Sequence, residues 1–230
     1  MRMHRILTFV FLCLAAGCRL SVVQIEKEEL ARLGGESKIT VVVYKPSQFN
    51  YSTAGDAAAV GLVGALTGGL GGAAYGVAME AKADRFVKEY SLEDPVGSAR
   101  DAFIAGITAG IDPGRLVPAP ETLTDDGVAA LQKSVGSVVV LDFKTRLWGF
   151  TSAPMRFSTY QVSYAVRARF VRLSDGKTLW QGYCEHLGSD AQWRATFDEF
   201  TANSGALLKQ KLTESAASCG KELLPQFSGK

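Results

Sequence analysis

The stretch YQVSYAVRARFVRLSDGKTLWQGYCEH, residues 160–186, decides the fold. Apolar and polar side chains alternate along residues 160–170, which is typical of a strand with one buried face and one wet face. The apolar face carries Tyr160, Val162, Tyr164, Val166, Ala168 and Phe170, and the polar face carries Gln161, Ser163, Arg167 and Arg169. The sequence SDGK at 174–177 predicts a turn, after which residues 178–186 return as the partner strand. Because a hairpin alone is marginally stable, it must belong to a larger sheet.

The other strands of that sheet lie upstream. KITVVVY (38–44) and SVVVLDF (137–143, continuing to 150) are β-branched and apolar, as expected for buried strands, and residues 115–119 form a short strand candidate. Helices are expected at residues 26–33, 95–111, 124–133 and 191–217. Helices alternate with strands first and an antiparallel hairpin follows, so we predict an α/β fold (an α+β sandwich) with a mixed sheet and flanking helices.

An uncharged run, AAAVGLVGALTGGLGGAAYGVAM at residues 57–79, interrupts this pattern as an inserted apolar, glycine-rich helix or helical hairpin. Residues four apart share one face of a helix, and small residues on such a face allow another backbone to approach closely. Four glycines have this spacing: Gly64, Gly68, Gly72 and Gly76. The run is about 23 residues long, which is enough for a helix to span a bilayer, since about 20 residues are needed. One reading is a glycine zipper that inserts in the membrane or self-associates, and the other is a buried helical hairpin or apolar loop.

A second stripe of small residues, Ala102, Gly106 and Gly110, lies on the helix expected at 95–111. It can pack directly on the first glycine run, or it can let the helix sit close to the sheet. We expect the sheet. Residues 80–89 are charged and helix-forming, so they can extend the helix of the first run into water.

The N-terminus has the features of a secretion signal: basic residues Arg2, His4 and Arg5, then an apolar segment at 6–14 that is too short to span a bilayer. The following LAAGC, residues 14–18, resembles the lipobox of bacterial lipoproteins. This resemblance implies that Cys18 is acylated and becomes the mature N-terminus, with a lipid such as palmitate as the membrane anchor. In that family an Arg after the cysteine, here Arg19, goes with retention at the outer membrane.

We therefore expect residues 1–17 to be a signal peptide, 18–37 a lipidated tether, and 38–230 one domain with the insertion at 57–79. Loss of Arg2 and Arg5 with the signal leaves 23 basic against 23 acidic side chains. This balance argues against nucleic-acid binding and against a polybasic membrane patch. The expected partners are the membrane, through the lipid, and envelope proteins or further copies of the chain.

Of the four cysteines, Cys13 leaves with the signal and Cys18 takes the lipid. Cys184 and Cys219 remain as an even pair in an oxidising compartment, so we predict a disulfide, worth about 3–4 kcal/mol. Two free thiols and a metal site are the alternatives. We expect no metal site because His186 is the only histidine of the mature chain, and Cys184 and His186 fall short of the usual ligand number.

No catalytic constellation is recognisable. The sequence has no G-x-S-x-G motif. The glycine run is not followed by the Lys-Ser or Lys-Thr pair of a phosphate-binding loop. His186 is the one histidine that could act as a base, and no nucleophile is recognisable beside it. The carboxylate pairs are expected to cap a helix at Asp125-Asp126 and to face solvent at Glu28-Glu29. We therefore expect a non-enzymatic protein with no cofactor and no small-molecule substrate.

The segments ALQKSVGSVVVLDFK (130–144) and YAVRARFVRLSDGKTLWQGYCEH (164–186) are similar to the periplasmic domain of the curli secretion lipoprotein. The outer-membrane activators of peptidoglycan synthases are alike. In these families a helix and strand precede a long hairpin whose return strand carries a Trp, here Trp180. The resemblance implies an envelope lipoprotein that binds other proteins in envelope assembly or maintenance. The alternative is an oligomeric outer-membrane secretion or export component that uses the glycine run for membrane insertion or self-association.

Overall fold

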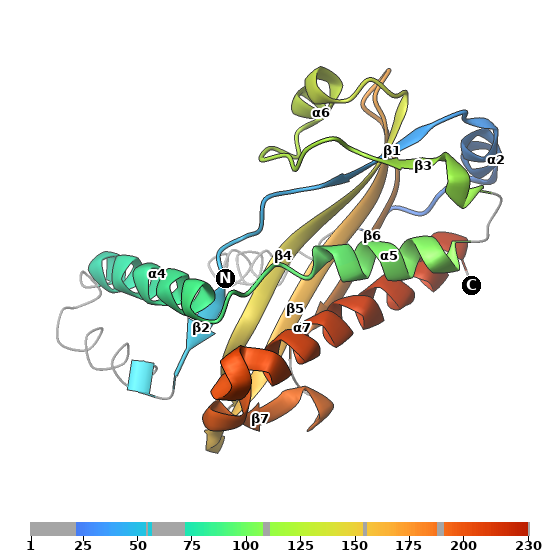
Figure 1. The fold of residues 1–230 in the computed structure, drawn as a ribbon. Coiled ribbons are helices and arrows are strands. Elements are labelled where there is room, and N and C mark those ends of the chain that lie inside the picture. The colour runs from blue at the N-terminus through green and yellow to red at the C-terminus, as the bar shows by residue number, and fades with distance from the viewer. Residues whose placement is uncertain are drawn as a thin grey trace, which may run out of the picture.

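The computed structural model describes residues 22–53, 55–56, 72–107, 111–153, 156–187 and 191–229. Its centre is a seven-stranded mixed sheet with the main order β3-β1-β4-β5-β6 (Figure 1). The strands are β1 (Ile39–Val43), β2 (Asn50–Ser52), β3 (Leu116–Pro118), β4 (Val139–Ala153), β5 (Arg156–Arg172), β6 (Thr178–His186) and β7 (Arg194–Thr196). The predicted α/β class with a mixed sheet is confirmed.

The long strands β4 and β5 form the middle of the sheet and pair antiparallel. The predicted hairpin is β5–β6, in which Phe170 lies opposite Trp180 and Val166 lies opposite Cys184. Two short strands extend the sheet at its far end: β2 pairs parallel with β4 beside β1, and β7 pairs antiparallel with β5 beside β6. One edge of the sheet is therefore formed by β3 and, farther along, by β2, and the other edge by β6 and β7.

The helices are α2 (Lys27–Gly35), α4 (Gly72–Glu89), α5 (Val96–Gly106), α6 (Val128–Ser134) and α7 (Phe197–Ser228). Helices α5 and α7 lie side by side across one face of the sheet, and α6 lies near the end of β1 and β4 (Figure 1). Most of the buried side chains, Phe103, Phe143 and Trp180 among them, form the core beneath α5 and α7. A smaller cluster on the opposite face joins Leu131 of α6 to Val140 and Val171.

The last helix begins later than expected. Residues 191–193 form a 3₁₀ turn and residues 194–196 form strand β7, so the prediction of a helix from residue 191 was wrong. Thr196 and Glu199 form a capping box that starts α7, which runs on to Ser228 past the expected end at 217. Within it, residues 202–205 have non-helical dihedral angles that mark a kink.

Residues 18–37 were expected to form a tether. From Val23 onward this segment lies against the domain: Val23 exchanges backbone hydrogen bonds with Gln181, and Leu33 of α2 is buried. Glu29 is also buried, and its carboxylate accepts hydrogen bonds of 2.8 and 3.0 Å from Arg172. The expectation that Glu29 faces solvent was wrong, since the hairpin end of β5 supplies its partner.

Only the end of the glycine run is described, since residues 57–71 lie outside the described part. Gly72 and Gly76 belong to α4, and the charged residues 80–89 continue that helix as expected. Among the described residues, no helix is long and apolar enough to cross a membrane.

Of the predicted small-residue stripe, Gly110 lies outside the described residues. Ala102 and Gly106 pack on α7, which corrects the expectation that they face the sheet. A Cβ atom added at Gly106 would overlap the Leu224 side chain. From the other side, a Cβ added at Gly220 would overlap the carbonyl oxygen of Ala99 and reach within 2.9 Å of Ala102. Phe103 is the residue of α5 that reaches the sheet, where its ring lies 5.4 Å from that of Trp180.

Candidate interaction site

The predicted site residues fall into three groups. Cys18, Gly64 and Gly68 lie outside the described residues. Gly72 and Gly76 lie on α4, at the end of the molecule opposite α2 (Figure 1). A disulfide joins Cys184 of β6 to Cys219 of α7, with their Cα atoms 5.4 Å apart.

A hollow of about 380 Å³ lies between α4 and the segment that contains β2. Gly76, Met79 and Ala83 line it from the helix, and Phe49 and Tyr51 line it from the strand side. These helix residues continue the stripe that buries Ala83 and Phe86, because 76, 79, 83 and 86 follow the spacing of one helical face. The stripe thus packs on the domain at its C-terminal end. At Gly76 the described residues leave it open, since none of them lies within 4 Å of an added Cβ.

Contacts between aromatic rings hold the C-terminal half of α4 against the strand β2. The Phe86 ring lies 4.5 Å from that of Tyr51 and 6.1 Å from that of Phe49. Phe49 in turn meets Trp148 edge to face at 4.7 Å, and the indole of Trp148 donates a hydrogen bond of 2.6 Å to the Ser47 carbonyl. Helix α4 and strand β2 therefore form one rigid unit beside the hollow.

Polar groups close one side of this unit. The Lys82 ammonium lies 2.6 Å from the Asp56 carboxylate and 4.9 Å from the centre of the Tyr51 ring. Burial alone would raise the pKa of Asp56, but hydrogen bonds from Lys82 and Thr53 hold this pKa below its usual value. Val77, one position beyond Gly76, points away and is 66% exposed. The site combines an open small-residue face, an exposed aliphatic side chain and the short edge strand β2.

A network of buried charges lies on the opposite face of the sheet, under the loop before α6. Asp142 is fully buried, and it accepts hydrogen bonds from Tyr44 at 2.9 Å and from Arg169. Arg167 donates to Asp126 at 2.8 Å and is 7% exposed. The expectation of a wet face at Arg167 and Arg169 was wrong, because the loop containing Asp126 covers it.

The same network corrects the expected role of the Asp125-Asp126 pair. Asp125 accepts a hydrogen bond from the backbone of Gly127, but Gly127 itself is the N-cap of α6 and no side chain caps the helix, so the predicted cap was wrong. Asp126 instead binds Lys144 and Arg167, each at 2.8 Å. Burial opposes its charge, but these two cations hold the pKa of Asp126 well below its usual range. Each charge has a partner within the fold, so we assign the network to structure.

A second hollow, of about 460 Å³, lies between the start of α5 and α7, lined by Asp94, Asp101 and Lys209 among others. Asp94 Oδ1 accepts hydrogen bonds from Thr145 at 2.7 Å and from the Val96 backbone at 3.1 Å, while its other oxygen is buried without a partner. Burial raises the pKa of Asp94 to about 6 despite these hydrogen bonds. Asp94 was expected to be the N-cap with Pro95 as the first helical residue. This was wrong by one residue, because Pro95 is the N-cap of α5 and has no side-chain capping bond.

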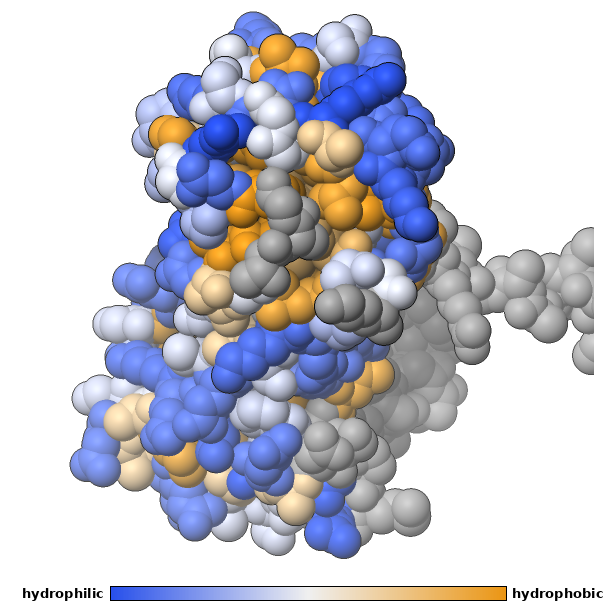
Figure 2. All heavy atoms as spheres, turned by 90° about the vertical axis from the view of Figure 1, so that its right-hand side faces the viewer, coloured by the Kyte–Doolittle hydropathy of each residue, from blue (hydrophilic) through white to orange (hydrophobic). Residues whose placement is uncertain are grey.

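At the end of the molecule that carries α2, apolar side chains gather inside a hydrophilic rim (Figure 2). The hollow nearest to α2 measures about 240 Å³ and is lined by Leu33, Val139 and Leu179. Arg172 and Glu29, which form a salt bridge with each other, line one side of this hollow. We regard this hollow as part of the packing of α2 on the sheet.

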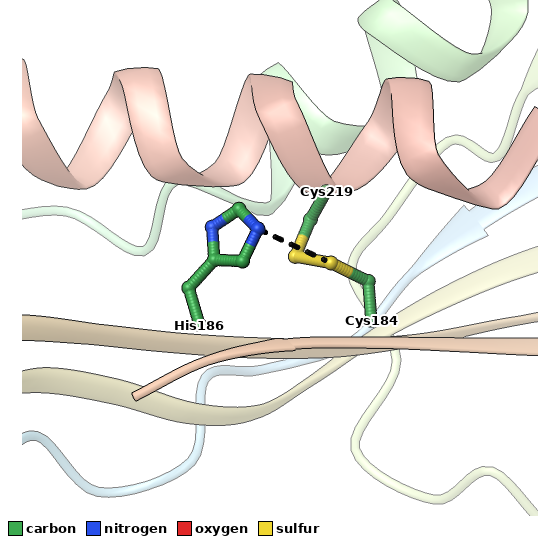
Figure 3. A group of neighbouring side chains, drawn as sticks. All are labelled: Cys184, His186 and Cys219. Carbon is green, nitrogen blue, oxygen red and sulfur yellow. Dashed lines mark hydrogen bonds between the residues drawn. A yellow bond between two sulfur atoms is a disulfide. The ribbon is translucent and has the colours of Figure 1, made fainter. Parts of the chain in front are cut away.

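His186 stands beside the disulfide rather than alone (Figure 3). One ring nitrogen lies 3.0 Å from the Ser215 hydroxyl and the other lies 2.8 Å from the Glu222 carboxylate. A serine, a histidine and a carboxylate in contact are the parts of a nucleophile–base pair. However, Ser215 is completely buried within α7, so no substrate reaches its hydroxyl. In the sequence, this cluster is indicated only by the seven-residue spacing of 215 and 222, which places both residues on one helix face.

No protein-family model and no curated protein matches the chain in sequence. Among solved structures, it is similar to the PelC dodecamer from Paraburkholderia phytofirmans, with 14% identity, a TM-score of 0.34, and coverage of 90% of this chain and 94% of that one. The lipoprotein GNA1162 from Neisseria meningitidis shows 16% identity and a TM-score of 0.25, with 78% and 99% covered. A neuraminyllactose-binding hemagglutinin homologue from Helicobacter pylori shows 11% identity and a TM-score of 0.33, with 81% and 86% covered. All three likenesses are weak.

Proposed function

We propose that this chain is a non-enzymatic lipoprotein of the Gram-negative cell envelope, anchored in the outer membrane by acylated Cys18. Its α/β domain faces the periplasm and binds another protein in envelope assembly or maintenance. The signal and lipobox at residues 1–18 support this location in the cell. The neutral side-chain charge of the mature chain fits an anchor made of lipid rather than of basic residues.

The observation that supports binding is the open end of α4. Glycine lowers helix stability by about 1 kcal/mol relative to alanine, and at Gly76 no contact within the described fold requires it. A close approach from outside the domain gives the missing reason. The exposed Val77 beside the hollow supplies apolar surface for such a contact.

A second copy of the chain is the partner that this surface fits best, which corresponds to the oligomeric secretion or export component considered above. The glycine spacing continues from 64 to 76, and two identical small-residue faces are complementary to each other. Helix α4 also carries three acidic and three basic side chains, so like charges do not oppose the pairing of two copies: Glu80, Lys82, Asp84, Arg85, Lys88 and Glu89.

Membrane attachment is tested with a Cys18→Ala chain secreted by an ordinary cleavable signal and extracted from washed membranes with carbonate. Release of the variant as a soluble protein, with the acylated chain retained, supports lipid as the anchor. Retention of the variant would show that residues 57–79 act as an integral element and would favour the export component.

Binding is tested by placing a photo-crosslinking residue at Val77 in the acylated chain. We expect a product of twice the chain mass, and we expect Gly76→Leu to abolish it by filling the hollow. Gly35→Leu on α2 is the matched control, because an added Cβ at Gly35 also meets nothing within 4 Å. A product with a different protein would identify a heterologous partner, and crosslinking unaffected by Gly76→Leu would exclude this surface.

A further inference from the structure

Three side chains with metal-ligand chemistry meet where β6 passes under α7. Ligand atoms of Cys184, His186 and Cys219 all lie within 4.8 Å of one another (Figure 3). They come from two elements, since Cys184 and His186 lie two apart on one face of the strand and Cys219 descends from the helix. Their positions are fixed by the core, because both cysteines are buried.

The histidine is oriented as a metal-binding imidazole. Its Nδ1 lies 3.0 Å from the buried Ser215 hydroxyl, which leaves Nε2 directed toward the sulfur of Cys184 at 3.8 Å. A hydrogen bond at the other ring nitrogen is the usual outer-shell support of a histidine ligand. Zinc bonds of about 2.0 Å to nitrogen and about 2.3 Å to sulfur place two tetrahedral ligands about 3.5 Å apart, close to the separation found here.

A fourth ligand and an entry path are present beside the histidine. Glu222 Oε1 lies 2.8 Å from Nε2 of His186, and the Glu222 side chain is 53% exposed. A cation can therefore enter from solvent past the carboxylate, while the two sulfur atoms lie on the inner side. Glu222 is one turn beyond Cys219 on α7, so both project toward the strand.

We propose that the reduced chain binds one Zn²⁺ through Cys184, Cys219, His186 and Glu222, so that disulfide and zinc site are two alternative states of one cluster. A phosphine supplies two electrons that break the S–S bond and becomes its oxide with oxygen from water, and each sulfur takes up one proton. Zn²⁺ then displaces both protons and bonds to the two thiolates. Cys184 and His186 alone are too few ligands for a metal site, but the fold brings Cys219 and Glu222 beside them.

The test uses the full mature chain in detergent, reduced with a phosphine, which becomes its oxide by taking oxygen from water. Co²⁺ is the probe because its thiolate complexes absorb in the near ultraviolet. We expect one Co²⁺ per chain with this absorption, displacement by one Zn²⁺, and no binding by the oxidised chain. A Cys184→Ser, Cys219→Ser double variant is expected to bind neither ion.

Two variants test the geometry. His186→Gln should weaken zinc binding at least about 100-fold, and Ser215→Ala should weaken it about 10-fold by removing the support of the imidazole. Unchanged affinity in His186→Gln would reduce the site to a simple dithiol and overturn the proposal. A reduced chain that binds no Co²⁺ would do the same, as would one that loses its helical circular dichroism on reduction and does not regain it with Zn²⁺.

Discussion

Two helices of this protein, α4 and α5, carry small residues at four-residue spacing, and the structure uses them in different ways. Between α5 and α7 the small residues form a closed seam, in which Gly106 faces Leu224 and Gly220 faces the backbone of Ala99. On α4 the small face is open at Gly76 as far as the described residues show, since none of them lies within 4 Å of an added Cβ. Glycine spacing alone therefore indicates that a helix can be approached closely, and does not tell which chain approaches it.

The difference follows from what lies beside each helix. Phe103 of α5 and Phe227 of α7 meet within the main core, with ring centres 5.9 Å apart, so burial of large apolar side chains draws the two helices together and small residues let them come close. Helix α4 has such an anchor toward its C-terminal end, at Ala83 and Phe86. Its N-terminal half extends beyond the strand that it packs on, and this half carries the glycines. The small residues between α5 and α7 serve the fold, whereas the described residues leave the face at Gly76 uncovered.

The largest expected effect is at the centre of the closed seam. Gly220→Ala should lower the free energy of unfolding by about 3 kcal/mol, because the new Cβ overlaps a backbone carbonyl that cannot rotate away. Urea unfolding followed by circular dichroism measures this loss. Gly35→Ala on α2 is the control and should not destabilise the chain; equal effects of the two substitutions would show that the seam is not closed.

Asp94, which lies just before α5, should make the stability of the fold depend on pH. Its pKa of about 6 lies above the value of 3.8 for a free aspartate, so the folded state favours the protonated form and stability falls as pH rises from about 4 to about 7. The pKa difference corresponds to at most about 3 kcal/mol, and we expect about 1–2 kcal/mol because the carboxyl is only partly buried.

Asp94→Asn removes this titration. The variant should gain stability relative to the parent chain as pH rises from 4 to 7, and the gain should level off above about pH 7. Urea unfolding at several pH values measures the difference, with Glu93→Gln as the neighbouring control. A difference independent of pH would mean that Asp94 is solvated in the fold.

At the edge of the closed seam the effect should be smaller. Gly106→Ala should cost about 1 kcal/mol, since the new methyl group overlaps the end of the flexible Leu224 side chain rather than a backbone atom. A double-mutant cycle with Leu224→Ala measures the coupling, which we expect to be about 1 kcal/mol. Additive effects of the two substitutions would contradict the contact.

Sequence periodicity predicted the parts of the fold in which side-chain pattern and burial agree. The alternation along β5 and the turn at 174–177 placed the hairpin correctly, and the β-branched runs placed β1 and β4. Strand β7 and the delayed start of α7 escaped prediction, because three residues give no period and their pairing with β5 is tertiary.

Burial of the charged face of β5 could not be predicted from the alternation of apolar and polar residues, because that pattern assigns every Arg to the solvent-exposed face. A signal was present in SVVVLDF, where Asp142 interrupts an apolar strand, because a buried carboxylate requires a cationic partner. In the sheet Asp142 lies opposite Arg169, and Lys144 lies opposite Arg167. Likewise, the contacts of His186 with Ser215 and Glu222 depend on the packing of α7 over β6, which no local pattern records.

The smallest effect on stability, and the one with opposite sign, is expected on the open face. Gly76→Ala should raise the free energy of unfolding by up to about 1 kcal/mol, because alanine is the better helix former and its methyl group enters empty space. Urea unfolding of the two chains at equal concentration measures the gain. The same substitution should weaken crosslinking through position 77 less than Gly76→Leu does, since a methyl group fills little of the hollow. If Gly76→Ala destabilises the chain, then the α4 face is already occupied, and the contrast between the two glycine helices fails.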